Sequence, residues 1–149
     1  MICVLVLATV YFFQYVKGLY PCPLCIMQRL AFYGYGIVCL VAVIQNVQGK
    51  FSRVYSILLA AFSGFGIAMA LRQLYLQHLP AGQAPACAPS LNFMLKNFPL
   101  HELLKTLLYG SGDCAIVHWK FLGFSMAGWS LVVLILLFVL SLKLCWQSR

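Results

Sequence analysis

Acidic residues are almost absent from this chain: Glu102 and Asp113 are the only two among its 149 residues. Charged side chains of both signs make up 8% of the sequence, whereas 64% of it is hydrophobic. A soluble domain of this length cannot bury so much apolar surface, so the composition predicts a protein whose solvent is lipid. The net charge of +8 does not predict a nucleic-acid partner, because the basic residues punctuate apolar runs and form no basic face.

A recognisable metal-binding pattern is missing as well. A zinc ribbon needs two Cys-x-x-Cys units, and the chain has one, Cys22–Cys25. The histidines are lone residues in the sequence: His78, His101 and His118. We therefore predict no metal site.

Four apolar runs predict membrane helices, since a helical bilayer span takes about 20 residues. The runs cover residues 1–16, 26–44, 54–79 and 121–142. The first run is short for a span. It also lacks the basic segment and the Ala-x-Ala site of a removed signal peptide, so we interpret it as a membrane helix. The predicted fold class is an all-α membrane protein, with a four-transmembrane-helix bundle formed by a single domain over residues 1–149.

A long loop, residues 80–120, connects the third and fourth predicted helices. Within it, five leucines between Leu100 and Leu108 recur at i, i+3, i+4, i+7 and i+8, which predicts a short amphipathic helix. Pro99 is suited to begin this helix and Gly110 to end it. We expect its leucine face to lie in the membrane interface. Packing of that face on the protein itself is the alternative.

The seven cysteines fall into two groups. Three lie in or at the ends of apolar helices and are interpreted as inert small hydrophobic residues: Cys3, Cys39 and Cys145. The other four form a Cys-x-x-Cys unit and a separated pair in the long loop: Cys22, Cys25, Cys87 and Cys114. Two dithiols that can meet, one of them in a loop, favour thiol–disulfide exchange. Structural disulfides in a non-catalytic membrane protein are the alternative.

The orientation of the bundle follows from its charges and cysteines. Four helices place residues 45–53 and the C-terminal end on one side, and all four candidate cysteines on the other. Basic residues are denser near the helix ends on the first side, which favours the cytoplasm for that side. Disulfides persist on the opposite side of such a membrane. We therefore expect the loop of residues 80–120 to be periplasmic.

The Cys-x-x-Cys unit stands where a helix is expected to begin. Proline is favoured at the first helical position, so Pro23 predicts a helix with Cys22 just outside it and Cys25 in its first turn. The unpaired N–H groups and the positive end of the helix dipole stabilise a thiolate there. Arg29 follows Cys25 by four residues and shares its helix face. This arrangement predicts redox chemistry at the mouth of a membrane helix.

Taken together, these motifs resemble the DsbB family, the disulfide-bond formation proteins B of bacterial inner membranes. The resemblance rests on four segments: Cys22-Pro-Leu-Cys25 with Arg29, Leu76-Gln-His-Leu-Pro80 before Cys87, Gly110-Ser-Gly-Asp-Cys114, and Trp119-Lys-Phe-Leu-Gly123. Vitamin K epoxide reductase relatives, a second quinone-linked group, place the loop pair before the Cys-x-x-Cys unit. The order is reversed here, which argues against them.

The resemblance implies a mechanism and its residues. A periplasmic DsbA-type thiol oxidase attacks the Cys87–Cys114 disulfide at Cys87. Cys114 then passes electrons to the Cys22–Cys25 disulfide, and Cys25 faces a membrane quinone, either ubiquinone or menaquinone. In this family the quinone site uses an arginine, here Arg29, and a polar residue of the third helix. Two residues qualify for the latter: Arg72 and His78.

Overall fold

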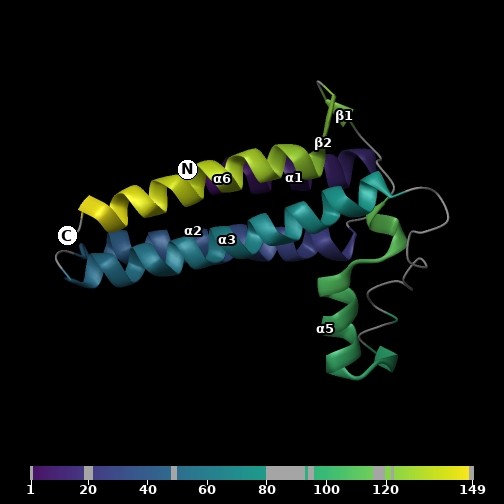
Figure 1. Ribbon diagram of the computed structural model, residues 1–149, viewed down its shortest axis with the longest axis horizontal. Helices are drawn as coiled ribbons and strands as arrows, with labels where there is room; N and C mark the ends of the chain where they lie inside the picture. The colour runs from purple at the N-terminus through teal and green to yellow at the C-terminus, as the bar shows by residue number, and fades with distance from the viewer. Residues whose placement is uncertain are drawn as a thin grey trace.

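Four long helices make up most of the computed structural model (Figure 1). The structure describes residues 2–18, 22–47, 50–79, 93, 96–115, 120–121 and 123–147. The long helices are α1 (Ile2–Lys17), α2 (Pro23–Ile44), α3 (Lys50–His78) and α6 (Met126–Gln147). The shorter elements are α5 (Leu100–Tyr109), the 3-10 turn η1 (Gly112–Cys114), β1 (Lys120–Phe121) and β2 (Phe124–Ser125). The predicted helical architecture is therefore confirmed, with one small hairpin added.

Three of the long helices have the length and composition of membrane spans. Within the described residues these are α2, α3 from Phe51 onward, and α6. The apolar part of α1, Cys3–Val16, is shorter, so a fourth span stays a prediction. Large apolar side chains on the outer faces, such as Ile37 and Leu136, are exposed. Such faces are suited to contact lipid, in which a helix satisfies its own backbone hydrogen bonds.

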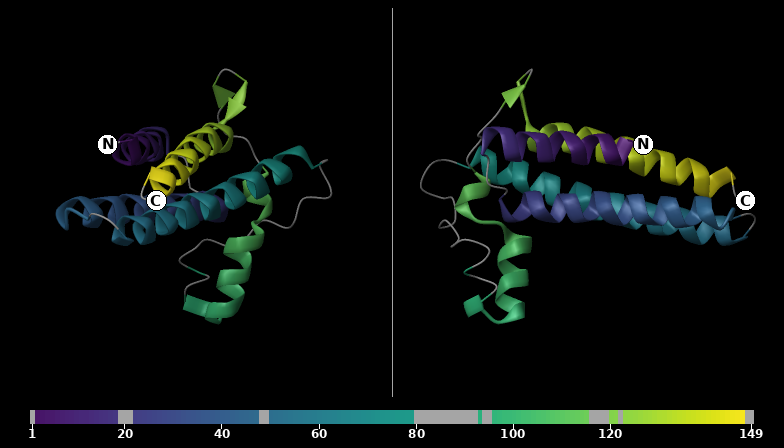
Figure 2. Two further views of the ribbon diagram at one scale, coloured as in Figure 1. Left: turned by 60° about the vertical axis from the view of Figure 1, so that its left-hand side comes forward. Right: turned by 180° about the vertical axis from the view of Figure 1, so that it is seen from behind.

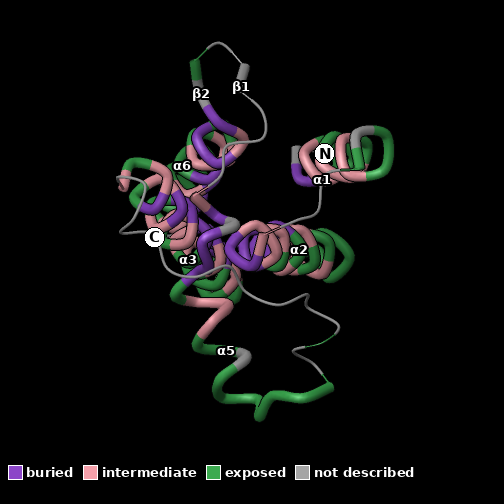
Figure 3. Tube along the Cα trace, turned by 90° about the vertical axis from the view of Figure 1, so that its right-hand side faces the viewer, coloured by how far each residue is buried: buried purple, intermediate pink, exposed green. Residues whose placement is uncertain are grey.

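The helices pack around two apolar clusters. α3 contacts both α2 and α6 along the bundle, and buried residues gather where these three helices meet (Figure 3). The larger cluster consists of Cys3, Phe32, Tyr35, Leu59, Ala70, Leu134 and Leu137. Gly66 lets α6 approach, because a Cβ there would lie 2.8 Å from a Leu134 methyl group. The smaller cluster, Leu24, Leu76 and Cys114, joins the loop to one end of the bundle.

The start of the fourth predicted helix, at residue 121, is wrong. Phe121 lies in β1 and pairs with Phe124 of the antiparallel strand β2, and α6 begins only at Met126. Gly123 explains the difference, because its φ of +83° forms a turn that few L-residues adopt. The apolar pattern alone did not reveal this turn. Ser125, which ends the hairpin, donates from Oγ to Gln77 Oε1 at 2.9 Å and so joins it to α3.

The predicted amphipathic helix of the loop is confirmed as α5. It projects away from the long axis of the bundle (Figures 1 and 2). Pro99 precedes it, and Gly110 ends it at a φ of +79°. Leu100 and Leu104 are exposed, as expected for a face that meets lipid, and the interfacial location stays a prediction. A Cβ at Gly110 would lie 2.8 Å from methyl groups of both Leu24 and Leu76, so this glycine lets the loop press against the bundle.

Candidate active site

Three of the four candidate cysteines meet at one end of α2. Cys22 is the N-cap residue of that helix, and its sulfur accepts a hydrogen bond from the N–H of Cys25 at 3.4 Å. The sulfurs of Cys22 and Cys25 are 2.7 Å apart. Cys114, in η1, is 1% exposed and its thiol is hydrogen-bonded to that of Cys22. Cys87 lies outside the described residues.

The local sequence explains why the thiols converge. Pro23 occupies the first helical position, as predicted, so α2 begins directly beyond Cys22. Gly110 permits the close approach of the loop, and η1 then returns the chain to the start of α2. Leu24 and Leu76 surround Cys114 with apolar contacts. The result is a loop cysteine buried against the Cys-x-x-Cys unit.

The hydrogen bond between Cys22 and Cys114 separates the acidities of the two thiols. It is the main reason that the pKa of Cys114 falls from its ordinary value of 9.0 to about 6, against the opposing effect of burial. Backbone N–H groups of Leu24 and Ser111 also donate to this sulfur and lower its pKa. The same hydrogen bond raises the pKa of Cys22, as do its hydrogen bond with Cys25 and its burial. In the reduced protein these opposite shifts favour a thiolate at Cys114 and a protonated thiol at Cys22.

Arg29 lies one turn beyond Cys25 on α2, and α1 orients its side chain. Its Nη1 donates to Gln14 Oε1 at 2.6 Å, and its guanidinium carbon lies 5.3 Å from the ring centroid of Tyr11. Its Nε is buried without a hydrogen-bond partner among the described residues. An unpaired buried donor is costly, so this atom is suited to bind an acceptor oxygen of a ligand.

Gln73 of α3 contacts the sulfurs, and the sequence did not single it out. Its Nε2 donates to Cys25 Sγ at 3.2 Å and to Cys22 Sγ at 3.5 Å. It is 5% exposed. The available signal was a polar side chain within an otherwise apolar span, which is expensive in a membrane and marks functional positions.

The chain is similar to known proteins over most of its length. The model of the family "Disulfide bond formation protein DsbB" matches residues 1–144. A disulfide bond formation protein B of Marinobacter nauticus is 49% identical over 142 residues, which are 95% of this chain and 84% of that protein. Proteins with the same description from Nitrosococcus oceani and Methylococcus capsulatus are 47% and 40% identical, over 98% and 99% of this chain and 85% and 90% of their own lengths.

The chain belongs to the DsbB family. The resemblance drawn from the cysteine motifs is thereby confirmed. The general function that it implied, disulfide-generating oxidoreductase chemistry in a membrane, is that of this family. The membrane-capable helices α2, α3 and α6 agree with a multi-pass membrane protein.

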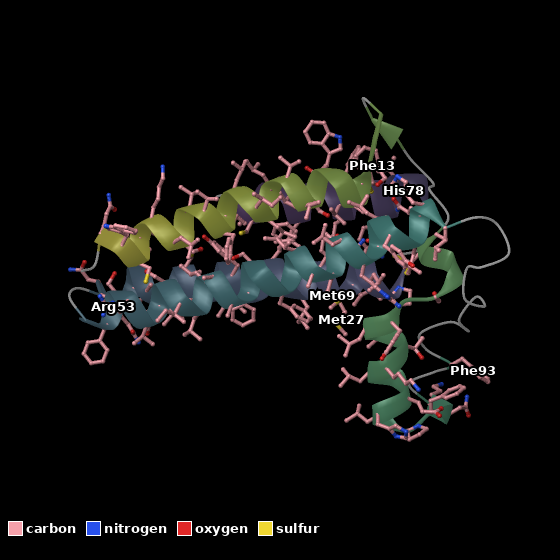
Figure 4. All side chains as sticks on the ribbon, in the orientation of Figure 1. Phe13, Met27, Arg53, Met69, His78 and Phe93 are labelled. Carbon is pink, nitrogen blue, oxygen red and sulfur yellow. The ribbon has the colours of Figure 1, made fainter. Side chains whose placement is uncertain are left out.

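The two residues of α3 predicted for the DsbB quinone site make their contacts elsewhere. Arg72 donates from Nε to the carbonyl of Tyr109 at 3.2 Å and lies over the Tyr109 ring, so it ties α5 to α3. His78 is exposed near the end of α3, where its Nδ1 lies 2.8 Å from the carbonyl of Leu74 (Figure 4). Their contribution to a quinone site stays a prediction.

The acidity of Cys114 gives a prediction for the reduced DsbB-family protein. We expect its thiolate to protonate as the pH falls through about 6, whereas in the unfolded chain it titrates at its ordinary value of 9.0. The Cys114 thiolate therefore contributes fully to the free energy of unfolding above pH 9, and this contribution is lost as the pH falls through about 6. The difference in ultraviolet thiolate absorbance between the reduced parent and a reduced Cys114→Ser variant measures this titration. A midpoint near 9.0 in the folded protein would contradict it.

Proposed function

We propose that this protein reoxidises a soluble periplasmic thiol oxidase of the DsbA type and passes the electrons to a membrane quinone. The observation that carries the proposal is the burial of Cys114 against Cys22 and Cys25. A disulfide relay needs a thiol of the loop pair to reach the Cys-x-x-Cys pair, and this contact supports such a junction. The proposed catalytic residues are Cys22, Cys25, Cys87 and Cys114.

The proposed relay begins in the loop. A thiolate of the soluble oxidase attacks Cys87 of the Cys87–Cys114 disulfide, forms a mixed disulfide and releases Cys114 with the electron pair of the broken bond. A lowered thiol pKa makes a good leaving group, and that of Cys114 falls to about 6. The Cys114 thiolate then attacks Cys22, breaks the Cys22–Cys25 bond and releases Cys25 as a thiolate.

The acceptor beyond Cys25 must be a strong oxidant. DsbA itself has a potential of about −120 mV, which lies above the glutathione poise of about −180 to −260 mV, so glutathione cannot reoxidise it. A bound quinone supplies a lipid-soluble acceptor of two electrons. The chain's residues fit such a group, because the buried Nε of Arg29 has no hydrogen-bond partner among the described residues and the positive charge of Arg29 favours a thiolate at Cys25.

The proposed setting is the bacterial inner membrane. A four-span bundle, residues 1–149 as one domain, would place the loop of residues 80–120 in the periplasm. There a soluble oxidase reaches the loop cysteines while the quinone stays in lipid. Arg72 and His78 remain the candidates of the third helix for the quinone site.

Right-side-out membrane vesicles provide the test of this function. Reduced DsbA-type oxidase is added outside vesicles that contain the protein and either ubiquinone or menaquinone. We expect oxidised oxidase to accumulate only when quinone is present, and the Cys25→Ser variant to abolish this turnover. Oxidation at an equal rate without quinone, or only in inside-out vesicles, would contradict the proposal. Comparing the two quinones identifies the one used.

A further inference from the structure

A chain of three polar side chains, of which Gln28 and Gln73 are buried, leads from α6 to the sulfurs. Ser130 of α6 donates from Oγ to Gln28 Oε1 at 2.8 Å. Gln28 of α2 donates from Nε2 to Gln73 Oε1 at 2.9 Å. Gln73 of α3 donates to both sulfurs of the Cys-x-x-Cys unit. We name Ser130, Gln28 and Gln73 the amide relay.

The amide relay connects all three membrane-capable helices. Gln28 is 6% exposed and Gln73 is 5% exposed, so neither amide has water to bind. A buried amide without partners is strongly destabilising, and here each amide oxygen accepts and each amide nitrogen donates within the chain of contacts. Apolar residues at these two positions would have been sufficient for helix packing. Their polarity therefore indicates a role at the sulfurs.

The hydrogen bonds of the amide relay all run in one direction. The Ser130 hydroxyl hydrogen on Gln28 Oε1 turns the Gln28 nitrogen toward Gln73, and this in turn directs the Gln73 nitrogen to the sulfurs. Gln73 Nε2 has two hydrogens, one for each sulfur. The Ser130 hydroxyl has a second acceptor, the carbonyl of Ala127, also at 2.8 Å. Without the donor at Ser130, both amides are free to reverse and present Gln73 Oε1 to the sulfurs.

We propose that Ser130 and Gln28 are positioning residues that hold the Gln73 amide as a donor to Cys22 and Cys25, and thereby favour the reduced form of this pair. Reduction of the Cys22–Cys25 disulfide takes up two electrons and one proton and gives one thiol and one thiolate. A hydrogen-bond donor stabilises the thiolate more than the neutral disulfide. The relay therefore makes the pair a stronger oxidant of Cys114, a role that rests on the proposed function.

The test measures the Cys22–Cys25 redox equilibrium directly. Purified full-length protein is equilibrated with dithiothreitol buffers, and alkylation followed by peptide mass spectrometry gives the oxidised fraction of this pair. We expect Ser130→Ala and Gln28→Met each to lower the equilibrium constant for reduction about tenfold, a potential about 30 mV more negative. Ser130→Thr keeps the hydroxyl and should restore the parent value.

Ser141→Ala is the matched control. Ser141 lies on the same helix and is fully buried, but its Oγ donates to the carbonyl of Leu137, far along α6 from the sulfurs. Its replacement should leave the equilibrium unchanged. An unchanged equilibrium in both Ser130→Ala and Gln28→Met, or an equal shift in Ser141→Ala or in Ser130→Thr, would overturn the proposal. Neither quinone nor oxidase enters this measurement, so its failure is distinct from a failure of the proposed function.

Discussion

A Cys114→Ser protein is expected to accumulate a covalent complex with the soluble oxidase, joined through Cys87. Cys87 is a free thiol in this variant, and its attack on the disulfide of the oxidised oxidase forms the mixed disulfide, while the Cys114 thiol that would displace the partner from Cys87 has been removed. In the parent, Cys114 lies against Cys22 and is proposed to carry the electrons forward. Removing one member of a catalytic set that acts as a unit costs about 10⁴-fold or more in turnover, so quinone-dependent oxidation should almost cease.

Non-reducing electrophoresis and peptide mass spectrometry of the trapped species provide the measurement. Serine cannot form the Cys87–Cys114 disulfide, so the variant is mixed with oxidised oxidase. The Cys87 thiol then attacks the disulfide of the oxidase and forms the same mixed disulfide. Cys39→Ser, on the membrane-embedded part of α2, serves as the control and should form no lasting complex. Recovery of the partner on Cys22 in place of Cys87 would reverse the assignment.

Local signals in the sequence were sufficient for the elements that carry the site. Pro23 predicted the first residue of α2 and the position of Cys22 outside it, because proline at a helix start is a property of a few neighbouring residues. The spacing of leucines between Pro99 and Gly110 predicted α5 in the same way. Both predictions needed no knowledge of what the elements pack against.

Features that depend on packing between distant segments were not visible in the sequence. Gln28, Gln73 and Ser130 lie in three different apolar runs, and only the packing of the helices shows that they touch. Arg72 and His78 were predicted from the family resemblance, as polar residues of the third helix, whereas Gln73 reaches the sulfurs because its face of α3 points into the bundle.

The contact between Cys114 and Cys22 also depends on packing between distant segments. Ninety-one residues of sequence, 23–113, lie between them, and the contact depends on how closely the backbone passes Leu24 and Leu76 at Gly110. The sequence shows that Gly110 has no Cβ, but it does not show which atoms a Cβ at this position would meet. The family resemblance implied the proposed order of electron transfer, and the structure shows the contact between Cys114 and Cys22 that supports it.

The Arg29→Ala protein is expected to lose quinone affinity while it retains its disulfide exchange. Arg29 has one nitrogen tied to Gln14, its charge over the Tyr11 ring, and a buried Nε with no partner among the described residues. A hydrogen bond from a charged group contributes about 1.5–3 kcal/mol, and each 1.4 kcal/mol corresponds to a factor of about ten in binding. The apparent KM for quinone should therefore rise about 10- to 100-fold.

Two measurements separate the quinone step from the exchange step in this variant. Steady-state turnover at varied quinone concentration gives the KM, and single-turnover reaction with reduced oxidase in the absence of quinone gives the rate of exchange at the loop cysteines. The first should change and the second should not, because the proposed exchange begins at the loop cysteines, whereas the Arg29 side chain contacts Gln14 and Tyr11 of α1. Arg53→Ala is the matched control, since this exposed arginine lies near the start of α3, at the end of the bundle opposite to His78 (Figure 4). An unaltered KM in Arg29→Ala would show that Arg29 anchors α2 to α1 and takes no part in the quinone site.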